Sequence, residues 1–398
     1  MKSIVFVIVF SFVSVSVFPQ WVLQDPIPQD KALLSTFFMD ELTGVAVGDS
    51  GAILKTIDGG STWTVIPSGT TNSLFMLHFP NATTGYAVGS RGAIAKTTDA
   101  GSNWTITSTQ VPYDYNSVFF TDANTGYAGG YSANVMKTVD GGANWAMSYH
   151  GQFDYWIQSI YFTDANTGYA ITSKSNYIDI EIIKTVDAGL TWSTIYTETD
   201  YHLYGLHFTS ENTGYAVGSA GRIVKTNDAG VTWTDCSIQT DKWIISCHFP
   251  EVDTGYAVME GGSIIRTLDG GDNWTFMPSP TNEDLFSVFF TNTNTGFAVG
   301  DHGTILKTTD GLSFTPETNT PESALTLVPN PVIDKFSLQL PLQFGEIVSV
   351  ELFSSTGKLV LKSDKTNDIE ITGFERGLYL VTVTNIEGEK LSARIIIK

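Results

Sequence analysis

The sequence predicts an all-β protein, a seven-bladed β-propeller followed by a small C-terminal β-sandwich, on three observations. A motif of Thr-Gly, an apolar or aromatic residue and usually Ala-Val-Gly recurs seven times, at steps of 41 to 46 residues. Each repeat holds four short runs rich in β-branched and aromatic residues, separated by turn residues, which is the pattern of four strands. Beyond Phe314 the repeat stops, and other short alternating runs follow. Four-stranded units of about 40 residues are typical of propeller blades, and a seven-turn solenoid is the alternative.

The N-terminal residues 1–19 are predicted to be a secretory signal peptide. Lys2 precedes an uncharged apolar run from Ile4 to about Val17, which is shorter than the roughly 20 residues of a membrane-spanning helix. We place the cleavage near Gln20, although small residues of the usual cleavage pattern are missing there. No transmembrane segment is expected in the mature chain.

The overall charge argues against a nucleic-acid partner. The chain has 41 acidic and 21 basic residues, for a formal net charge of −20, so it lacks the cationic surface that tracks phosphates. Cys236 and Cys247 are the only cysteines. The repeat places them on strands of different blades, so we expect two free thiols in place of a disulfide.

Each repeat also carries a Lys/Arg-Thr-x-Asp segment followed by a tryptophan, which Phe314 replaces in the seventh copy. An aspartate in a tight turn can accept backbone N–H bonds, glycine supplies positive φ, and the tryptophan covers the turn. Because an active site occurs once and this segment seven times, we interpret it as structural. The aspartates are Asp58, Asp99, Asp140, Asp187, Asp228, Asp269 and Asp310.

This segment resembles the Asp-box of the sialidase-type and BNR repeat families, and the whole unit, over residues 21 to 315, is similar to the repeats of photosystem II stability/assembly-factor-like propellers. The propeller is therefore expected to span residues 20–315. Trp21 precedes the first Phe-rich strand as Trp63 precedes the second. Residues 21–28 are thus predicted to supply the outer strand of blade seven and close the ring.

The loops of a propeller fall on two faces. When the strands of a blade are lettered a to d from the axis outward, the a–b and c–d loops lie on one face, which we call lower, and the b–c and d–a loops on the other, the upper face. The lower face carries the near-constant a–b loops and the Asp-boxes, so binding is expected at the variable loops of the upper face.

Blades three to six crowd aromatic residues onto these upper loops, and aromatic faces suit carbohydrate stacking or peptide side chains. Packing between neighbouring blades explains the same residues equally well. Basic and acidic residues share this face, which does not favour an anionic glycan. The candidate ligand-binding residues are Tyr113, Tyr115, Tyr131, Tyr155, Trp156, Tyr177, Tyr201, Trp243, Arg91 and Arg222.

No catalytic residue, cofactor or metal site is predicted. His78, His207 and His248 occupy a position that holds phenylalanine or tyrosine in the other repeats, so we interpret them as packed rings and not as metal ligands. No Asp-rich calcium loop is present. Sialidase-like chemistry needs three converging arginines, and the propeller has only Arg91, Arg222 and Arg266, the last in the structural repeat position.

The region from Leu325 to Lys398 resembles the C-terminal sorting domain of type IX secretion substrates, after a Thr/Pro/Glu-rich linker at 316–324. The resemblance implies export by the type IX secretion machinery of a Bacteroidetes-type cell, with this region as the address, and release or attachment at the outer surface. An ordinary accessory β-sandwich is the alternative. The matching pieces are Pro329-Asn330-Pro331, the turn Ser355–Lys358, Gly377-Leu378-Tyr379 and Lys398.

Three functions follow from the sequence. The first is a secreted or cell-surface propeller without catalytic activity, which binds an unknown glycan or surface protein through its upper face. The second is an Asp-box glycoside hydrolase, and the third is an assembly or scaffold factor for an extracellular complex.

Overall fold

The structure is a computed structural model, and its contacts divide the chain into a unit of residues 19–313 and a unit that includes residues 314–398; each is described by itself. The signal peptide and linker predicted above, Tyr177 and Asp310 lie outside the described residues. The described residues are 21–25, 27–108, 112–151, 154–174, 179–309, 325–328, 332, 334–340, 347–354, 358–374, 376–386 and 390–397.

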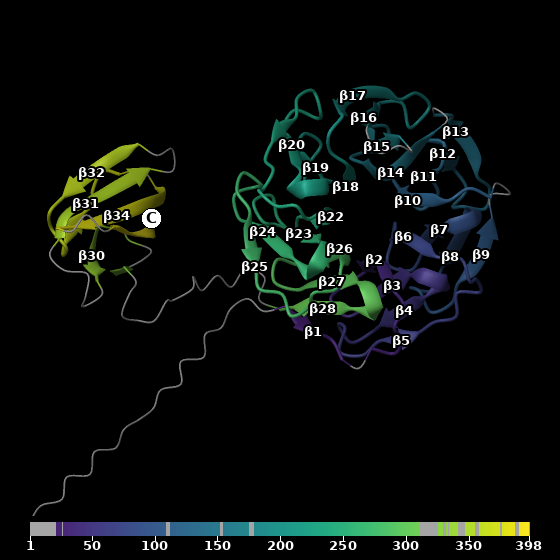
Figure 1. Ribbon diagram of the computed structural model, residues 1–398, viewed down its shortest axis with the longest axis horizontal. Helices are drawn as coiled ribbons and strands as arrows, with labels where there is room; N and C mark the ends of the chain where they lie inside the picture. The colour runs from purple at the N-terminus through teal and green to yellow at the C-terminus, as the bar shows by residue number, and fades with distance from the viewer. Residues whose placement is uncertain are drawn as a thin grey trace, which may run out of the picture. The chain divides into compact units, whose positions relative to one another are not determined.

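The N-terminal unit is a ring of seven four-stranded antiparallel sheets (Figure 1), which confirms the predicted seven-bladed propeller. The second strand of each blade begins with glycine. A Cβ at this position would collide with the phenylalanine at the end of the blade's first strand, as a Cβ at Gly44 would collide with Phe38. Blades one to three comprise β2 (Leu33–Phe38), β3 (Gly44–Gly48), β4 (Ile53–Thr56) and β5 (Thr64–Val65); β6 (Leu74–His78), β7 (Gly85–Gly89), β8 (Ala93–Thr97) and β9 (Thr105–Ser108); β10 (Tyr115–Phe120), β11 (Gly126–Gly130), β12 (Val135–Thr138) and β13 (Ala146–Tyr149).

Blade four has the longest strands of the ring, because its inserted b–c residues extend the sheet toward the upper face: Tyr155 pairs with Lys174, and Ile180 with Glu198. Blades four to six comprise β14 (Tyr155–Phe162), β15 (Gly168–Lys174), β16 (Ile180–Thr185) and β17 (Ser193–Glu198); β18 (Leu203–Phe208), β19 (Gly214–Gly218), β20 (Ile223–Thr226) and β21 (Thr234–Asp235); β22 (Ile244–His248), β23 (Gly255–Met259), β24 (Ile264–Thr267) and β25 (Thr275–Met277).

Blade seven is completed by the N-terminal segment, as predicted. Its strands β26 (Leu285–Phe290), β27 (Gly296–Gly300) and β28 (Ile305–Thr308) are joined by β1 (Val22–Leu23), which pairs antiparallel with β28; Figure 1 shows the purple β1 beside the green β28. Trp21 is only 1% exposed, and its ring lies edge-on to Phe290 with centroids 5.8 Å apart. The ring is therefore closed by pairing between the two ends of the propeller sequence.

Five b–c loops form short 3-10 turns whose central residue has positive φ, between 49° and 62°. Each turn reverses the chain within three residues at the upper end of its blade. The turns are η1 (Asp49–Gly51), η2 (Ser90–Gly92), η3 (Ser219–Gly221), η4 (Glu260–Gly262) and η5 (Asp301–Gly303).

On the lower face, each described Asp-box closes its own turn. Asp58 Oδ1 accepts hydrogen bonds from the Thr62 backbone N–H (2.9 Å) and the Thr56 hydroxyl (2.9 Å), and Gly59 and Gly60 have positive φ. The same bonds recur at Asp99, Asp140, Asp187, Asp228 and Asp269. Donation from the residue four positions later, first from its side chain and then from its backbone, lowers the pKa of Asp99 to about 2.

The repeat lysines also tie neighbouring blades together, which the sequence did not indicate. Lys96 Nζ (2.5 Å) and the Tyr86 hydroxyl (2.7 Å) both donate to the carbonyl oxygen of Gly141 in the following Asp-box. Lys137 and Tyr127 donate in the same way to Ala188, and Lys307 closes the ring by donating to the carbonyl oxygen of Gly59 (2.6 Å). The side chains of these repeated lysines therefore join neighbouring blades.

A closed collar of seven aromatic rings surrounds the propeller axis near the lower end of the inner strands. Neighbouring ring centroids lie 4.6 to 5.8 Å apart. Burial lowers the pKa of His78 and His207 to about 4, so both are neutral and accept backbone N–H bonds from Phe120 and Phe249. These histidines act as packed rings, as predicted. The collar comprises Phe37, His78, Phe119, Tyr161, His207, His248 and Phe289.

Both cysteines are free, and burial raises the pKa of the Cys247 thiol to about 12. No helix among the described residues has the length and apolar character needed to cross a bilayer.

The C-terminal unit consists of two small sheets around one core. The core includes Val332, Phe336, Val350, Val381 and Ile395, all at most 1% exposed. The first sheet contains β29 (Thr326–Val328), β30 (Lys335–Gln339) and β33 (Ile369–Glu370), and the second contains β32 (Leu359–Ser363), β31 (Ile347–Ser354), β34 (Gly377–Asn385) and β35 (Lys390–Ile397).

Candidate functional site

The inner part of the upper face is built from two positions of the repeat. In six blades the backbone N–H of the first b–c residue donates to the carbonyl oxygen of the residue before strand a, as Tyr131 does to Asp114 (3.0 Å) and Glu260 to Trp243 (3.1 Å). This bond fixes two side chains next to each other at the upper end of each of these blades. Which residues occupy the two positions therefore decides the chemistry of the face.

Three aromatic residues from blades three and four meet on this face, and we call them the first trio: Tyr113, Tyr131 and Trp156. The Tyr113 and Tyr131 centroids are 5.0 Å apart, and the Trp156 ring lies edge-on to Tyr131 at 4.9 Å. A backbone bridge between Tyr131 and Trp156 joins the two blades at this point. Tyr113 is 40% exposed, so the trio presents an aromatic surface to solvent.

A second trio, His202, Tyr204 and Trp243, lies on blades five and six. Tyr204 stacks on Trp243 with centroids 5.5 Å apart and planes 26° apart, and His202 lies 6.0 Å from Tyr204. Burial lowers the pKa of His202, so its ring is neutral at pH 7. Trp243 remains 41% exposed. The two trios together form what we call the aromatic arc.

The other side of the upper face is acidic. Glu260, Asp301 and Asp49 are the first b–c residues of blades six, seven and one, and Asp284 precedes the inner strand of blade seven. Burial and the neighbouring carboxylates, Asp284 foremost, raise the pKa of Asp301. We call these four residues the acidic arc. It meets the aromatic arc at blade six, where Glu260 Oε2 accepts the backbone N–H of Trp243 (3.3 Å).

Two of the predicted ligand-binding tyrosines pack within the protein. Tyr115 is 2% exposed and occupies the buried first position of strand a, where the other inner strands have aliphatic residues, so it does not reach the upper surface. Tyr155 is half-buried and packs against the core between blades three and four, and burial raises the pKa of its hydroxyl. We leave both residues out of the candidate site.

Arg222 belongs to a tie between blades four and five. Its guanidinium donates to Glu198 and to the Tyr196 hydroxyl (3.0 Å) of blade four and to Asp235 of blade five, and its side chain is 13% exposed. Tyr201 lies over the guanidinium, with its ring centroid 5.1 Å away. These partners saturate the charge of Arg222, so it is not available to a ligand, and Tyr201 packs with it.

Arg91 stands on the exposed b–c turn of blade two, where its backbone N–H donates to Asp114 (2.8 Å). Arg266 is 6% exposed, and Arg222 is held as above. The three arginines therefore lie in different blades and do not converge, and among the described residues no three metal-ligating side chains form a group. The arginine triad that sialidase-like chemistry needs is therefore not assembled by Arg91, Arg222 and Arg266.

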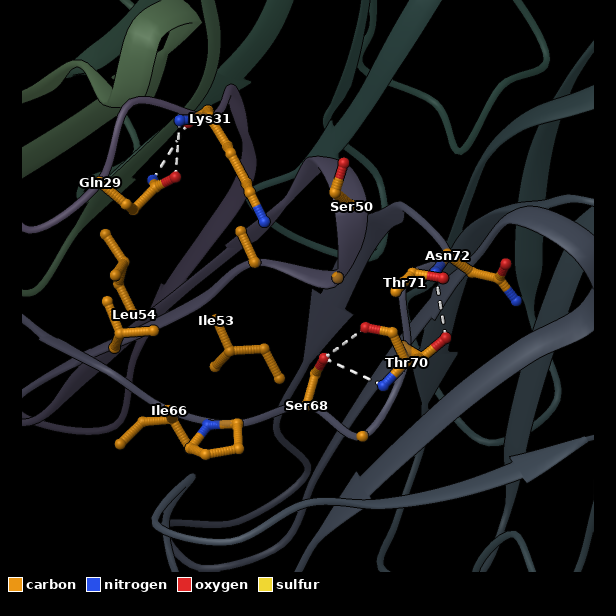
Figure 2. Close-up of a pocket in the computed structure, with 15 residues that line it drawn as sticks. Gln29, Lys31, Ser50, Ile53, Leu54, Ile66, Ser68, Thr70, Thr71 and Asn72 are labelled. Carbon is orange, nitrogen blue, oxygen red and sulfur yellow. Dashed lines mark hydrogen bonds between the residues drawn. The ribbon is translucent and has the colours of Figure 1, made fainter.

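An open depression of about 740 Å³ lies on blade one beside the closing segment, and Figure 2 shows its lining. Its floor includes Ile53 and Leu54, and it has no aromatic side chain or carboxylate in its lining. The hydroxyl of Ser68 donates to the Thr70 carbonyl (3.0 Å), and Thr70 Oγ1 accepts from the backbone of Asn72 (3.0 Å), as the dashed lines show. Because these polar groups bond to each other, we interpret the depression as a structural gap beside the closing segment and do not include it in the candidate site.

Sequence reasoning missed the contact between Trp243 and Glu260. Trp243 was predicted to lie on the upper face, where acidic residues were also expected, but its contact with Glu260 runs across the b–c turn. The signal was in the repeat alignment, because six blades share the backbone bond that brings these two positions together.

Comparisons with known proteins agree with this architecture. Residues 14–112, 63–147 and 184–280, together more than half of the chain, match the family described as photosynthesis system II assembly factor YCF48. Residues 326–398 match the family described as secretion system C-terminal sorting domain. No curated protein matches the chain.

Three solved structures are similar in fold. YCF48 bound to D1 peptide superposes with a TM-score of 0.62 at 18% identity, over 74% of this chain and 96% of that chain. YCF48 from Cyanidioschyzon merolae gives 0.60 at 21% identity, over 72% and 98%. PorZ, an essential bacterial surface component of the type IX secretion system of Porphyromonas gingivalis, gives 0.54 at 11% identity, over 89% and 58%. At these identities the likeness establishes the fold alone.

Proposed function

Because the chain belongs to the photosynthesis system II assembly factor YCF48 family and ends in a secretion system C-terminal sorting domain, we propose that it is an exported propeller without catalytic activity that binds a glycan or a protein through its aromatic arc. The sorting domain indicates secretion and attachment at the cell surface. Neither family description names a catalytic activity.

The observation that carries the proposal is the exposure of aromatic rings on otherwise well-packed loops. Trp243 and Tyr113 are 41% and 40% exposed, and each packs against other rings that hold it in place. Rigid aromatic side chains that keep an exposed surface provide large contact area at little cost in conformational entropy. Packing between blades accounts for the buried parts of both trios and leaves these exposed parts for a partner.

A second candidate function is that of an assembly or scaffold factor for an extracellular complex. The family description as an assembly factor, and a YCF48 structure that holds a peptide, favour a protein partner. The glycoside hydrolase alternative has less support, since the arginines lie apart and Glu283 is paired with His302 Nδ1 (2.7 Å). The sorting region, residues 325–398, is proposed to engage the type IX secretion machinery.

The test is a screen of the exported chain against a glycan array and against surface proteins of the producing cell. We expect a ligand whose binding falls at least about tenfold in Trp156→Ala or Trp243→Ala, because an aromatic anchor contributes about 1–3 kcal/mol to an interface. Phe276→Ala is the matched control, since Phe276 is 51% exposed on the outer strand of blade six. A ligand that binds all three variants like the wild type would place the site elsewhere, and hydrolysis of a glycan would favour the hydrolase.

A further inference from the structure

The two arcs of the upper face meet at one place, the upper end of blade six. Trp243 and Glu260 occupy the two variable positions of this blade and are joined by two bonds: the Glu260 N–H donates to the Trp243 carbonyl (3.1 Å), and the Trp243 N–H donates to Glu260 Oε2 (3.3 Å). An exposed indole and a carboxylate are therefore held beside each other by the backbone. This combination occurs at blade six and at no other blade end among the described residues.

We propose that this junction binds a cationic side chain, arginine or lysine, of a partner polypeptide. The inference rests on the proposed function and specifies the class of ligand for the second trio. The indole face supplies the cation–π contact and Glu260 supplies the opposing charge. A guanidinium fits both, because it is planar, stacks on aromatic faces and pairs with carboxylates.

The surroundings of the junction favour a cation over a neutral or anionic ligand. Asp284 Oδ1 accepts the N–H of Gly261 (2.6 Å), the residue after Glu260, so a second carboxylate lies on the other side of the same turn. The nearest lysine in sequence, Lys242, donates to the Ser263 hydroxyl (2.7 Å) and the Gly261 carbonyl and is directed to this turn. One lysine, Lys242, thus lies at a turn that also carries the carboxylates of Glu260 and Asp284.

The carboxylates of the acidic arc repel one another. Asp301 follows Asp284 around the ring, and its raised pKa reflects burial and the repulsion of nearby carboxylates, which His302 offsets only in part. A cation bound at blade six would reduce this repulsion, so binding is favoured by the arc as well as by the direct contacts. Within the second trio, Tyr204 and His202 pack against the indole, with ring centroids 5.5 and 6.3 Å away.

The test measures binding of a short synthetic peptide that alternates arginine with glycine and serine to the exported full-length chain, by calorimetry at physiological ionic strength. The control peptide carries citrulline, which keeps the shape of arginine but has no charge. We expect the citrulline peptide to bind at least about tenfold more weakly, and Trp243→Leu to weaken the arginine peptide by about tenfold, with a smaller loss in Trp243→Phe.

Charge variants separate the site from general attraction to an acidic protein. Glu260→Gln is expected to weaken the arginine peptide by about three- to tenfold, whereas Glu211→Gln, which makes the same change of net charge on the lower face between β18 and β19, changes it by less than about twofold. Equal binding of the two peptides, no binding of the arginine peptide, or equal effects of the two glutamate variants overturns the inference.

The same measurements distinguish this inference from the proposed function. If a glycan or a neutral peptide binds and is lost in Trp156→Ala and Trp243→Ala, the aromatic arc is a binding surface but the cation site is wrong. If no ligand of any class depends on either tryptophan, both proposals fail.

Discussion

On the lower face, Tyr127 and Lys137 both donate to the carbonyl oxygen of Ala188 in the next blade. The same pair of hydrogen bonds recurs between other neighbouring blades. At the upper ends of blades three and six, two equally fixed positions hold Tyr131 and Glu260, which differ in size and charge. The same backbone thus carries repeated side chains on one face and varied ones on the other. Repetition marks the residues that join blades, and variation above a constant backbone bond marks the surface left for a ligand.

The largest difference in stability between a structural and a ligand-binding aromatic residue is expected at the closure of the ring. Trp21→Ala should lower the free energy of unfolding by about 3–5 kcal/mol, since it removes a fully buried aromatic ring between β1 and the core of blade seven. Trp243→Ala should change it by less than about 1 kcal/mol, because its ring is partly exposed. Urea unfolding of both variants checks this, and similar losses in the two would remove the distinction.

The aromatic collar predicts a dependence of stability on pH. Burial lowers the pKa of His78 and His207 to about 4 in the folded protein, whereas the unfolded chain titrates near 6.5. Between these values the unfolded state binds more protons, so the stability is present in full above about pH 6.5 and is lost as the pH falls toward about 4, by about 1–3 kcal/mol for each histidine.

The double variant His78→Phe with His207→Phe should reduce this loss of stability between pH 6.5 and 4.5. Urea unfolding at several pH values measures it. The Asp-box carboxyls titrate lower, with the pKa of Asp99 at about 2, so their contribution is lost below about pH 4 and does not overlap this range. An unchanged pH profile in the double variant would show that His78 and His207 are not the cause.

A smaller effect is expected from a single bond between blades. Tyr127→Phe removes the hydroxyl that donates to Ala188 and should lower the free energy of unfolding by about 1 kcal/mol, while Lys137 still satisfies that carbonyl. Tyr113→Phe, on the upper face, should have little effect. Thermal unfolding of the pair measures the difference, and an equal effect of both would contradict the division of roles.

Much of the fold could be predicted because the sequence pattern of a blade occurs seven times. The number of blades, the closing strand at Val22–Leu23 and the Asp-box turns all follow from positions that recur in register. The residues of the candidate site were harder to predict. Tyr115 occupies the buried position that Leu33 holds in blade one, a fact visible only once the start of the inner strand is known.

Arg222 shows a second limit of sequence reasoning. Its partners Glu198 and Asp235 lie on the outer strands of two neighbouring blades, and no spacing in the sequence indicates that these strands meet at Arg222. Pairings between loops depend on the geometry of the ring, whereas the repeat records only what is common to the blades.

The most direct test of the account compares the two faces by binding. For the ligand that the screen identifies, the dissociation constant is measured for Trp156→Ala with Trp243→Ala on the upper face and for Leu42→Ala with Ile57→Ala, two residues 59% and 69% exposed on the lower face. The account predicts a loss of at least about tenfold for the upper pair and less than about twofold for the lower pair. An equal loss in both pairs, or a larger loss in the lower pair, would contradict it.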